Sequence, residues 1–478
     1  MKKWMIRALS ALLIAAFLPL SVLADEYDLS EGSVTVSTTK GADGSTQQKV
    51  THKDTTKPDN NPTITSNGNE TKNTITIDAG AGTTANVTIK DANISASSGK
   101  AAIKTGGEGN VNLNVEGTNT VSSGSNYAGV EKANAGNLTI GSESGSGELT
   151  ANGGWHGAGI GGGHYRDAND ITITGGEVTA NGGDGAAGIG GGYYSYGKDI
   201  TISGGKVVAN GSGSAAGIGG GHYGNGSNIT ISGGEVTATG GDYGAGIGGG
   251  YYGNGSNITI SGGEVTATGG DCGAGIGGGY GRGGSNIAIS KDSQVEAVGG
   301  AVGGAGGSSD GCGAAIGNGG NNNRVNGSEI EPDTSGLYTT GKVERIRGDG
   351  TVLDTITGTV EPPVEPEKSA SSEEEPDKRE PLYRVLNLDG SSLKHQAQKA
   401  DGVLALTAKA DGAILTGTLR ALGYLQNQGI EKITFTDGTH SAELVLAELI
   451  AKGQPEDVYV LTLGAENTLT LNGEVIDF

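Results

Sequence analysis

The sequence predicts an all-β chain whose main part is a right-handed parallel β-helix with about 29 residues in each coil. The first observation behind this is a repeat, because strand-like segments begin 29 residues apart at Asp170, Asp199, Asn228, Asn257 and Asn286. The second is composition, since 94 of the 478 residues are Gly and only 4% are aromatic. Gly does not recur at every third position, which excludes collagen, so the glycines must serve another regular architecture.

Each repeat contains three short segments in which inward apolar residues alternate with outward ones, the period of a β-strand. In one copy these pairs are Ile229 with Ile231, Val236 with Ala238, and Ala245 with Ile247. Three strands per coil, stacked in parallel, would align equivalent residues in ladders. Looser copies begin at Asn86, Asn110 and Asn137, so we expect the β-helix to span residues 73–320.

The N-terminus has the features of a secretory signal peptide over residues 1–24. Lys2, Lys3 and Arg7 precede a short apolar stretch, and the small residue Ala24 stands at the expected cleavage point. We therefore expect a secreted protein or one on the extracellular cell surface.

The remaining segments differ from the repeats in composition. Residues 25–72 form a polar segment suited to cap the first coil, and residues 321–360 a closing segment. Residues 361–381 are rich in Pro, Ser and Glu, which predicts an acidic linker. For residues 382–478 we expect a small α+β domain with helices in 412–429 and 441–453 and strands in 431–437, 457–463 and 467–473.

The charge of the chain restricts its partners. The formal net charge is −22, which would repel nucleic acids and anionic membrane surfaces. No segment after residue 24 is apolar enough to cross a bilayer, so we expect no membrane span in the mature chain. We expect a monomer whose partner is a polysaccharide or a host glycan.

That partner is suggested by aromatic residues that follow each "GIGGG" run and align between coils. Sugar rings present apolar C–H faces to aromatic rings and hydroxyls to their polar rims. The alternative is that the tyrosines only pack on one another and cover the Gly-rich turns. The predicted glycan-binding residues are Tyr165, Tyr193, Tyr194, His222, Tyr223, Tyr251, Tyr252 and Tyr280.

The two cysteines occupy the same position in successive coils. Cys272 precedes Ile276 by four residues, and Cys312 precedes Ile316 by four. Coils stack about 4.8 Å apart, and a disulfide needs Cα atoms about 4.4–6.8 Å apart. A Cys272–Cys312 disulfide is predicted for an exported chain, with two free thiols as the alternative.

Carboxylates also align in columns. One column contains Glu148, Glu177, Glu235 and Glu264 and is interrupted by Lys206; a second contains Asp184, Asp242 and Asp271. Such columns suit Ca²⁺, although exposed carboxylates also tolerate this spacing in water. We expect no other cofactor and assign no metal ligand.

Three classes of function remain open. The favoured one is a non-catalytic protein that binds an extended glycan, and the second is a structural or protein-binding adhesin. The third is a polysaccharide lyase or hydrolase of the β-helix type. Catalysis needs distinct environments, which near-identical coils do not supply; only the irregular stretch with His164, Arg166, Asp167 and Asp170 is a candidate.

The chain also resembles a family, the glycine-rich right-handed β-helix surface proteins of anaerobic Gram-positive bacteria, some of which are described as carbohydrate-binding. The resemblance covers most of residues 26–320. It is carried by "EYDLSEGSVTV", "NVTIKDANISASSGKAAIKTGG", "EGTNTVSSGSNYAGVE" and the "AGIGGG" repeats. It implies the fold and a surface setting, and it supplies no motif of binding residues.

Overall fold

The computed structural model describes residues 25–361, apart from 42–43, 302–312, 322–325 and 349, and residues 383–476, apart from 389–390, 392, 401, 411, 428–429, 455–456, 465–466 and 473. The predicted signal peptide, Cys312 and nearly all of the predicted linker lie outside the described residues. The chain divides into two compact units, Met1–Val364 and Glu365–Phe478, each with its own apolar core.

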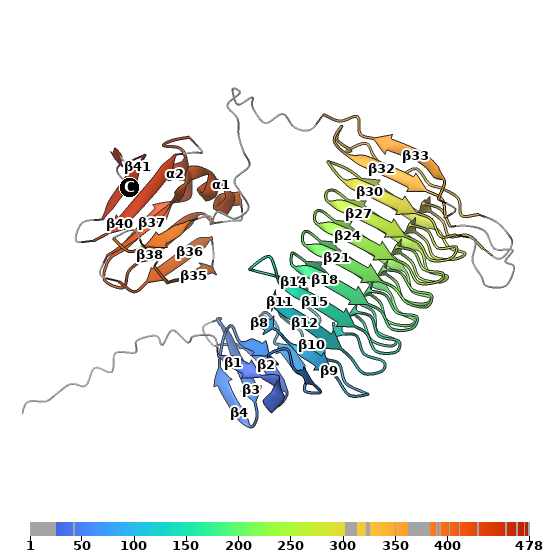
Figure 1. Cartoon of the computed structure of the whole chain (residues 1–478), viewed down its shortest axis with the longest axis horizontal. Coiled ribbons are helices and arrows are strands. Elements are labelled where there is room, and N and C mark those ends of the chain that lie inside the picture. The colour runs from blue at the N-terminus through green and yellow to red at the C-terminus, as the bar shows by residue number, and fades with distance from the viewer. Residues whose placement is uncertain are drawn as a thin grey trace, which may run out of the picture. The chain divides into compact units, whose positions relative to one another are not determined.

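The first unit is a parallel β-helix built from three sheets, and Figure 1 shows its strands stacked coil upon coil. In order, the first sheet contains β1 (Glu26–Asp28), β5 (Thr63–Thr65), β8 (Thr84–Lys90), β11 (Asn110–Glu116), β14 (Leu138–Gly141), β17 (Ile171–Ile173), β20 (Gly197–Ile202), β23 (Gly226–Ile231), β26 (Gly255–Ile260) and β29 (Gly284–Ile289). A single 3₁₀ turn, η1 (Leu29–Glu31), follows β1.

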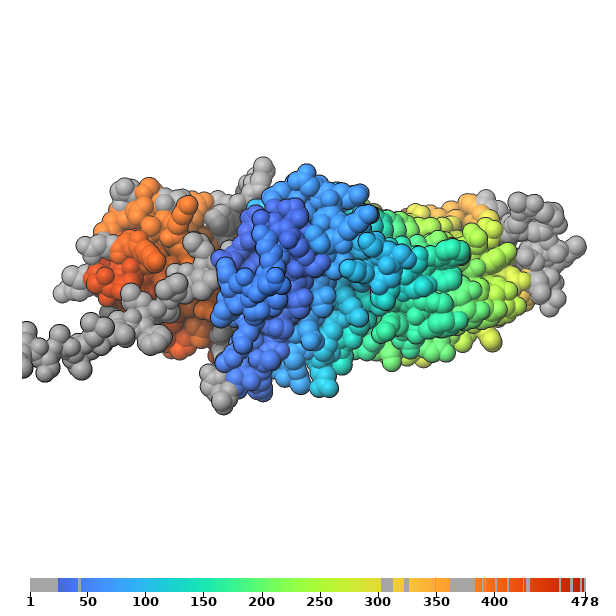
Figure 2. All heavy atoms as spheres, turned by 90° about the horizontal axis from the view of Figure 1, so that it is seen from below, coloured from blue at the N-terminus to red at the C-terminus, as the bar shows by residue number. Residues whose placement is uncertain are grey.

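The second and third sheets complete each coil. The second contains β31 (Ile316–Gly317), β28 (Ile276–Gly277), β25 (Ile247–Gly248), β22 (Ile218–Gly219), β19 (Ile189–Gly190), β16 (Ile160–Gly161), β13 (Val130–Glu131), β10 (Ile103–Gly107), β7 (Ile75–Ala79), β2 (Val34–Lys40), β3 (Thr46–His52) and β4 (Thr55–Pro58). The third contains β33 (Val352–Thr357), β32 (Lys342–Ile346), β30 (Gln294–Val298), β27 (Glu264–Thr268), β24 (Glu235–Thr239), β21 (Lys206–Asn210), β18 (Glu177–Asn181), β15 (Glu148–Asn152), β12 (Thr118–Ser122), β9 (Asn93–Ser95) and β6 (Glu70–Thr71). Figure 2 shows the coils from below as successive bands of colour.

Equivalent residues of successive coils face each other across the strand pairs. Ile200 lies opposite Ile229, and Ile229 opposite Ile258, while Ile218 lies opposite Ile247 on the second sheet. All are fully buried, because the pleat turns alternate residues of each strand inward. The predicted parallel β-helix and its ladders are confirmed.

The parallel coils extend beyond residues 73–320 at both ends. Strand β1 pairs in parallel with β5, β2 with β7, and β32 with β30. The N-terminal strands are rich in Thr, Lys and Gln, yet Val34 and Val36 occupy inward positions and are fully buried. The polar composition of this segment therefore concealed its strand pattern, in which the inward residues are still apolar.

Antiparallel strands and polar side chains close the two ends of the β-helix. Strands β2, β3 and β4 form antiparallel pairs at one end, and β32 and β33 at the other. The Gln48 amide accepts from the N–H of Asn86 and donates to its carbonyl, both at 2.9 Å. The Glu329 carboxylate accepts from the N–H groups of Ala315 at 2.7 Å and Ile316 at 3.1 Å. These bonds satisfy backbone groups that an open strand edge would leave unpaired.

Close packing of neighbouring backbones explains the glycine column in the second sheet. Gly219 has a φ of +133°, a conformation that residues with a Cβ rarely adopt. A Cβ at this position would lie 2.0 Å from the carbonyl oxygen of Gly248 in the next coil. The other glycines of the column share this φ, so the repeat requires Gly here in every regular coil.

The second unit contains two sheets and two short helices. One sheet is β34 (Arg384–Leu386), β37 (Ala413–Thr418), β40 (Val458–Leu463), β41 (Thr468–Leu471) and β42 (Glu474–Ile476), and the other is β35 (His395–Ala400), β36 (Val403–Ala408), β38 (Lys432–Thr436) and β39 (Ser441–Val445). The helices are α1 (Leu419–Asn427) and α2 (Leu446–Ile450). Among the described residues, no helix is both long enough and apolar enough to span a membrane.

The helices of this unit are shorter than expected. The first halves of 412–429 and 441–453 form strands β37 and β39, and helix α1 or α2 begins only afterwards. Ala413 and Leu415 are buried at alternate positions of β37. The spacing of apolar residues therefore changes from that of a strand to that of a helix within this segment. The expected strands in 431–437, 457–463 and 467–473 are present as β38, β40 and β41.

Candidate functional site

The structure brings all eight predicted aromatic residues together in the turn that follows the second-sheet strand of successive coils. They form two columns along the β-helix. The inner column contains His164, Tyr193, His222, Tyr251 and Tyr280, and the outer column contains Tyr165, Tyr194, Tyr223 and Tyr252.

The outer tyrosines stack ring on ring. The ring centroids of Tyr194 and Tyr223 are 5.3 Å apart with planes 1° from parallel. Tyr165 stacks on Tyr194 at 5.7 Å, and Tyr223 on Tyr252 at 5.8 Å. Arg282 lies over the Tyr252 ring, 5.9 Å from its centroid, at the C-terminal end of this column. The faces of the middle rings are therefore covered by their neighbours.

The rings of the inner column also stack on one another, except that His156 takes the place of His164 at the N-terminal end. Tyr193 and His222 stack at 4.9 Å, and His222 and Tyr251 at 5.2 Å. The ring that stacks on Tyr193 from the preceding coil is His156, at 4.3 Å, whereas His164 meets Tyr193 edge-on. His156 lies in the turn that follows the third sheet, so two different turns contribute to this stack.

The two columns differ in exposure, which departs from the expectation of one flat exposed strip. Tyr165 is 69% exposed, Tyr194 46% and Tyr223 44%, whereas Tyr280 is only 5% exposed. The other inner residues are half-buried between the outer column and the preceding turn. A ligand would meet the edges and hydroxyls of the outer rings, because stacking occupies their faces.

The backbone of the outer column is strained. Tyr165, Tyr194, Tyr223 and Tyr252 all have φ between +54° and +60°. The left-handed region is uncommon for bulky residues and costs roughly 1–2 kcal/mol relative to the right-handed one. The next coil has Gly281 at this position, with a φ of +69°, so a residue free of this strain fits the same turn.

Burial favours the uncharged form of residues in the inner column. It is the main cause that raises the pKa of Tyr193 to about 12, with the neighbouring Tyr194 hydroxyl adding to it. Burial also lowers the pKa of His164 and that of His222, which favours neutral imidazoles. These inner residues thus offer neutral hydrogen-bonding groups.

Two further exposed aromatic residues, Trp155 and Tyr196, were not among the residues predicted from the sequence. Trp155 is 63% exposed and meets His156 edge-on at 5.5 Å. It takes the place that Asp184 and Asp242 have in later coils, a substitution visible in the repeat alignment. Tyr196 is 47% exposed and lies two residues beyond Tyr194 in the same turn.

A groove of about 380 Å³ lies at the N-terminal end of the aromatic columns. It exists because the turn between Val130 and Leu138 is three residues shorter than the corresponding turn between Ile160 and Ile171 and has no aromatic pair. The residues that line it are Ser98, Gly99, Ser125, Asn126, Tyr127, His164 and Arg166.

A buried carboxyl group lies beneath this end of the columns. Glu131 is 1% exposed and accepts a hydrogen bond from the N–H of Ala128 at 2.7 Å. A Cβ at Gly163 would lie 2.8 Å from a Glu131 carboxyl oxygen, so the turn covers this group directly. Burial raises the pKa of Glu131, while Ala128 and Arg166 oppose that shift. Arg166 approaches Glu131 at 3.8 Å and keeps a side chain that is 59% exposed.

Asp167 and Asp170, the other residues of the irregular stretch, form hydrogen bonds within and between the turns. The Asp167 carboxylate accepts from the N–H of Tyr196 at 2.8 Å. Asp170 has a φ of +54° and accepts from the side chain of Asn169 at 2.6 Å. Equivalent positions in later coils form a similar ladder, in which Asn228 donates to Asp199 at 2.8 Å. Asp167 and Asp170 therefore have structural roles.

The predicted carboxylate column is aligned as expected. Glu148 lies opposite Glu177, and Glu235 opposite Glu264. Lys206 lies between the two pairs and approaches Glu177 at 3.7 Å. Within the described residues, no group of three or more His, Cys, Asp or Glu side chains is arranged to hold a metal ion.

Ile276 pairs with Ile316, the residue that follows Cys312 by four positions in the sequence. Cys272 is buried and has a φ of +65°. Since Cys312 lies outside the described residues, the disulfide stays a prediction.

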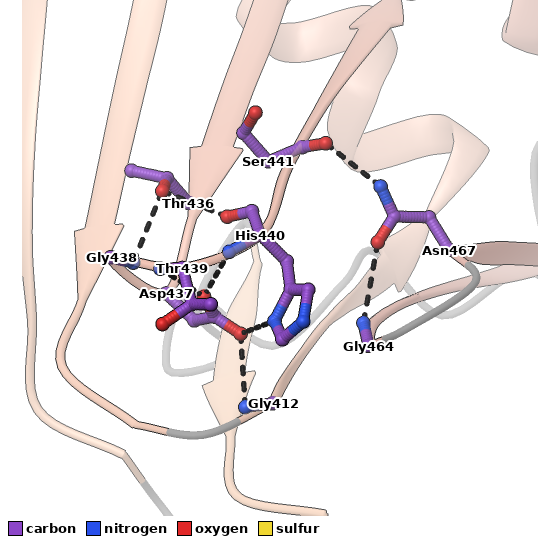
Figure 3. A network of polar contacts seen from close by, with 9 residues as sticks. All are labelled: Gly412, Thr436, Asp437, Gly438, Thr439, His440, Ser441, Gly464 and Asn467. Carbon is purple, nitrogen blue, oxygen red and sulfur yellow. Dashed lines mark hydrogen bonds and ion pairs between the residues drawn. The ribbon is translucent and has the colours of Figure 1, made fainter.

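In the second unit, the buried carboxylate of Asp437 lies within a network of polar contacts, shown in Figure 3. Asp437 accepts hydrogen bonds from the N–H groups of Gly412, Thr439 and His440 and from the imidazole of His440. Burial alone would raise the pKa of Asp437, but these hydrogen bonds outweigh it and hold the pKa at about 2. The network ties the β38–β39 hairpin to a neighbouring loop, which is a structural role.

Comparison with known proteins supports the fold of the regular coils. A family model described as "Beta helix repeat" matches residues 144–164, 171–193, 200–222, 229–251 and 258–280. No curated protein and no solved structure matches the chain. Each matched segment ends at a residue of the inner column, so the chain is similar to β-helix repeat proteins over the coils that carry the aromatic columns.

Proposed function

We propose that this protein is exported, acts at or beyond the cell surface, and binds an extended glycan along the outer aromatic column without catalysing a reaction. The observation that carries the proposal is backbone strain. Four successive coils keep Tyr in a left-handed conformation where Gly281 shows that Gly fits. Strain that persists over several equivalent positions indicates a role for the side chain beyond local folding.

The geometry favours contact with the ring edges and hydroxyls of the column. Ring centroids recur at 5.3–5.8 Å along the β-helix, close to the length of one sugar unit. Because the ring faces are covered, each sugar would hydrogen bond to a Tyr hydroxyl and pack on a ring edge. Each contact is weak, but several on one polymer act together.

The same geometry favours binding over catalysis. The residues of the outer column are equivalent in successive coils, so they do not supply the distinct acid and base that hydrolysis requires. The carboxyl group with a raised pKa nearest to the columns belongs to Glu131, which is covered by the turn at Gly163. A structural or protein-binding adhesin remains the second candidate, because stacking alone also stabilises the turns.

A glycan array probed with the mature chain tests the proposal. We expect binding to extended polysaccharides, and incubation with each of them should release no new reducing ends. Binding to no glycan would favour the adhesin. Release of reducing ends would instead identify an enzyme.

A further inference from the structure

We propose that the groove at the N-terminal end of the columns binds a sugar that carries an anionic group, a carboxylate or a sulfate, and that Arg166 contacts this group. The inference rests on the proposed function and names a chemical class for part of the ligand. An extended glycan that follows the outer column would reach the groove next, since His164 and Arg166 line it and Tyr165 lies between them in the sequence.

The first observation is charge. The chain as a whole is strongly acidic, with a formal net charge of −22. The described residues that line the groove nevertheless include Arg166 and no Asp or Glu. On an acidic surface, a local positive charge selects an anionic sugar over a neutral one when other contacts hold the sugar beside it.

The second observation is the availability of Arg166. Within the described chain its one ion pair is the 3.8 Å approach of Nε to Glu131, and its side chain is 59% exposed. The two terminal guanidinium nitrogens are therefore available for the paired hydrogen bonds that a carboxylate or sulfate accepts.

The third observation is the polar lining of the groove. Ser98, Ser125 and Asn126 add polar side chains suited to sugar hydroxyls.

The fourth observation is exposed aromatic surface at this end. Tyr165 is the most exposed ring of the outer column, at 69%. Trp155 is 63% exposed, and its carbonyl accepts a hydrogen bond from the N–H of Asn126, which lines the groove. A sugar in the groove would pack beside these two rings while its anionic group contacts Arg166.

The test uses the fluorescence of Trp155, the one tryptophan after residue 24, in titrations of the mature chain. The probes are a galacturonic acid hexamer, a sulfated galactose hexamer and the neutral galactose hexamer. We expect one of the two anionic hexamers to bind at least about 10-fold more tightly than the neutral one, as a charged hydrogen-bonded pair predicts. The probe that binds identifies the anionic group.

Arg166→Gln should weaken that binding about 10- to 100-fold and leave the neutral hexamer unaffected. The matched control is Arg282→Gln, because Arg282 has the same place in its turn at the other end of the column and lies over Tyr252. An unchanged circular dichroism spectrum shows that each variant is folded. Equal affinity for charged and neutral hexamers, or an Arg166→Gln variant with parental affinity, would overturn the inference while the proposed function stands. If none of the three hexamers binds, the inference is overturned, and the glycan array decides the proposed function separately.

Discussion

Replacing Tyr194 by Gly and, separately, by Ala tests the backbone strain on which the proposed function rests. Tyr194 has a φ of +60° and stacks on Tyr165 at 5.7 Å and Tyr223 at 5.3 Å. Both variants lose the two stacked contacts, each worth roughly 0.5–1.5 kcal/mol. Only the Gly variant also relieves the left-handed strain of roughly 1–2 kcal/mol.

The difference between the two variants isolates the strain. Gly loses roughly 0.5–1 kcal/mol more than Ala through the entropy of the unfolded chain. At the midpoints of these ranges relief of strain outweighs this loss, so the Tyr194→Gly variant should be more stable than Tyr194→Ala by about 0.75 kcal/mol. Tyr196 is the matched control, because it lies in the same turn, is 47% exposed, and has a negative φ. Here the order should reverse, with Tyr196→Ala more stable than Tyr196→Gly.

The assay is urea unfolding of the mature chain, followed by the fluorescence of Trp155, which lies in the β-helix and so reports on that unit. The measured quantity is the free energy of unfolding of each variant, compared within each Gly and Ala pair. If Tyr194→Ala equals or exceeds Tyr194→Gly in stability while the Tyr196 pair keeps its expected order, the outer column is not strained. The main argument for a binding role would then fail.

Three further predictions concern the fold. Gly219→Ala should lower the free energy of unfolding by more than about 2 kcal/mol, because its Cβ would lie 2.0 Å from a carbonyl oxygen. In the control Gly175→Ala the nearest atom is 3.8 Å from the new Cβ, so the same urea assay should show a change of less than about 1 kcal/mol. The pKa of Asp437 is about 2 when folded and about 3.9 when unfolded, so its ionisation should stabilise the second unit by about 2.6 kcal/mol above pH 4. This effect should be lost as the pH falls toward 2. Acid titration of the parent and of Asp437→Asn, followed by near-ultraviolet circular dichroism, should show this dependence in the parent alone, and an identical profile in both would contradict it. Peptide mapping without reductant should recover Cys272 linked to Cys312, and two freely alkylated thiols would refute the disulfide.

The repeat made most of the β-helix predictable. A period of 29 residues with alternating apolar positions predicts which isoleucines face inward and which tyrosines align, and the strand register agrees. The polar N-terminal coils were harder to detect, because Val34 and Val36 keep the inward pattern among Thr, Lys and Gln. The groove was in principle detectable, since the turn before Leu138 is visibly shorter than its later equivalents.

The properties of the candidate site were less predictable because they depend on three-dimensional packing. Alignment of equivalent residues does not reveal whether their rings present faces or edges, and stacking covers the faces of Tyr194 and Tyr223. It does not distinguish the buried Tyr280 from the exposed Tyr165 either. The left-handed backbone of the outer column had one hint in the sequence, the Gly at position 281.

The most direct test of glycan binding along the outer column is a calorimetric titration of one array-selected polysaccharide with three proteins. These are the parent, the triple variant Tyr194→Gly, Tyr223→Gly and Tyr252→Gly, and the control Tyr196→Gly. Three hydrogen-bonded contacts of about 1 kcal/mol each predict a loss of at least about 100-fold in the triple variant, which the relief of strain should keep folded. The control should bind within about threefold of the parent. Parental affinity in a folded triple variant would contradict the account, because the outer column would then not be the binding site.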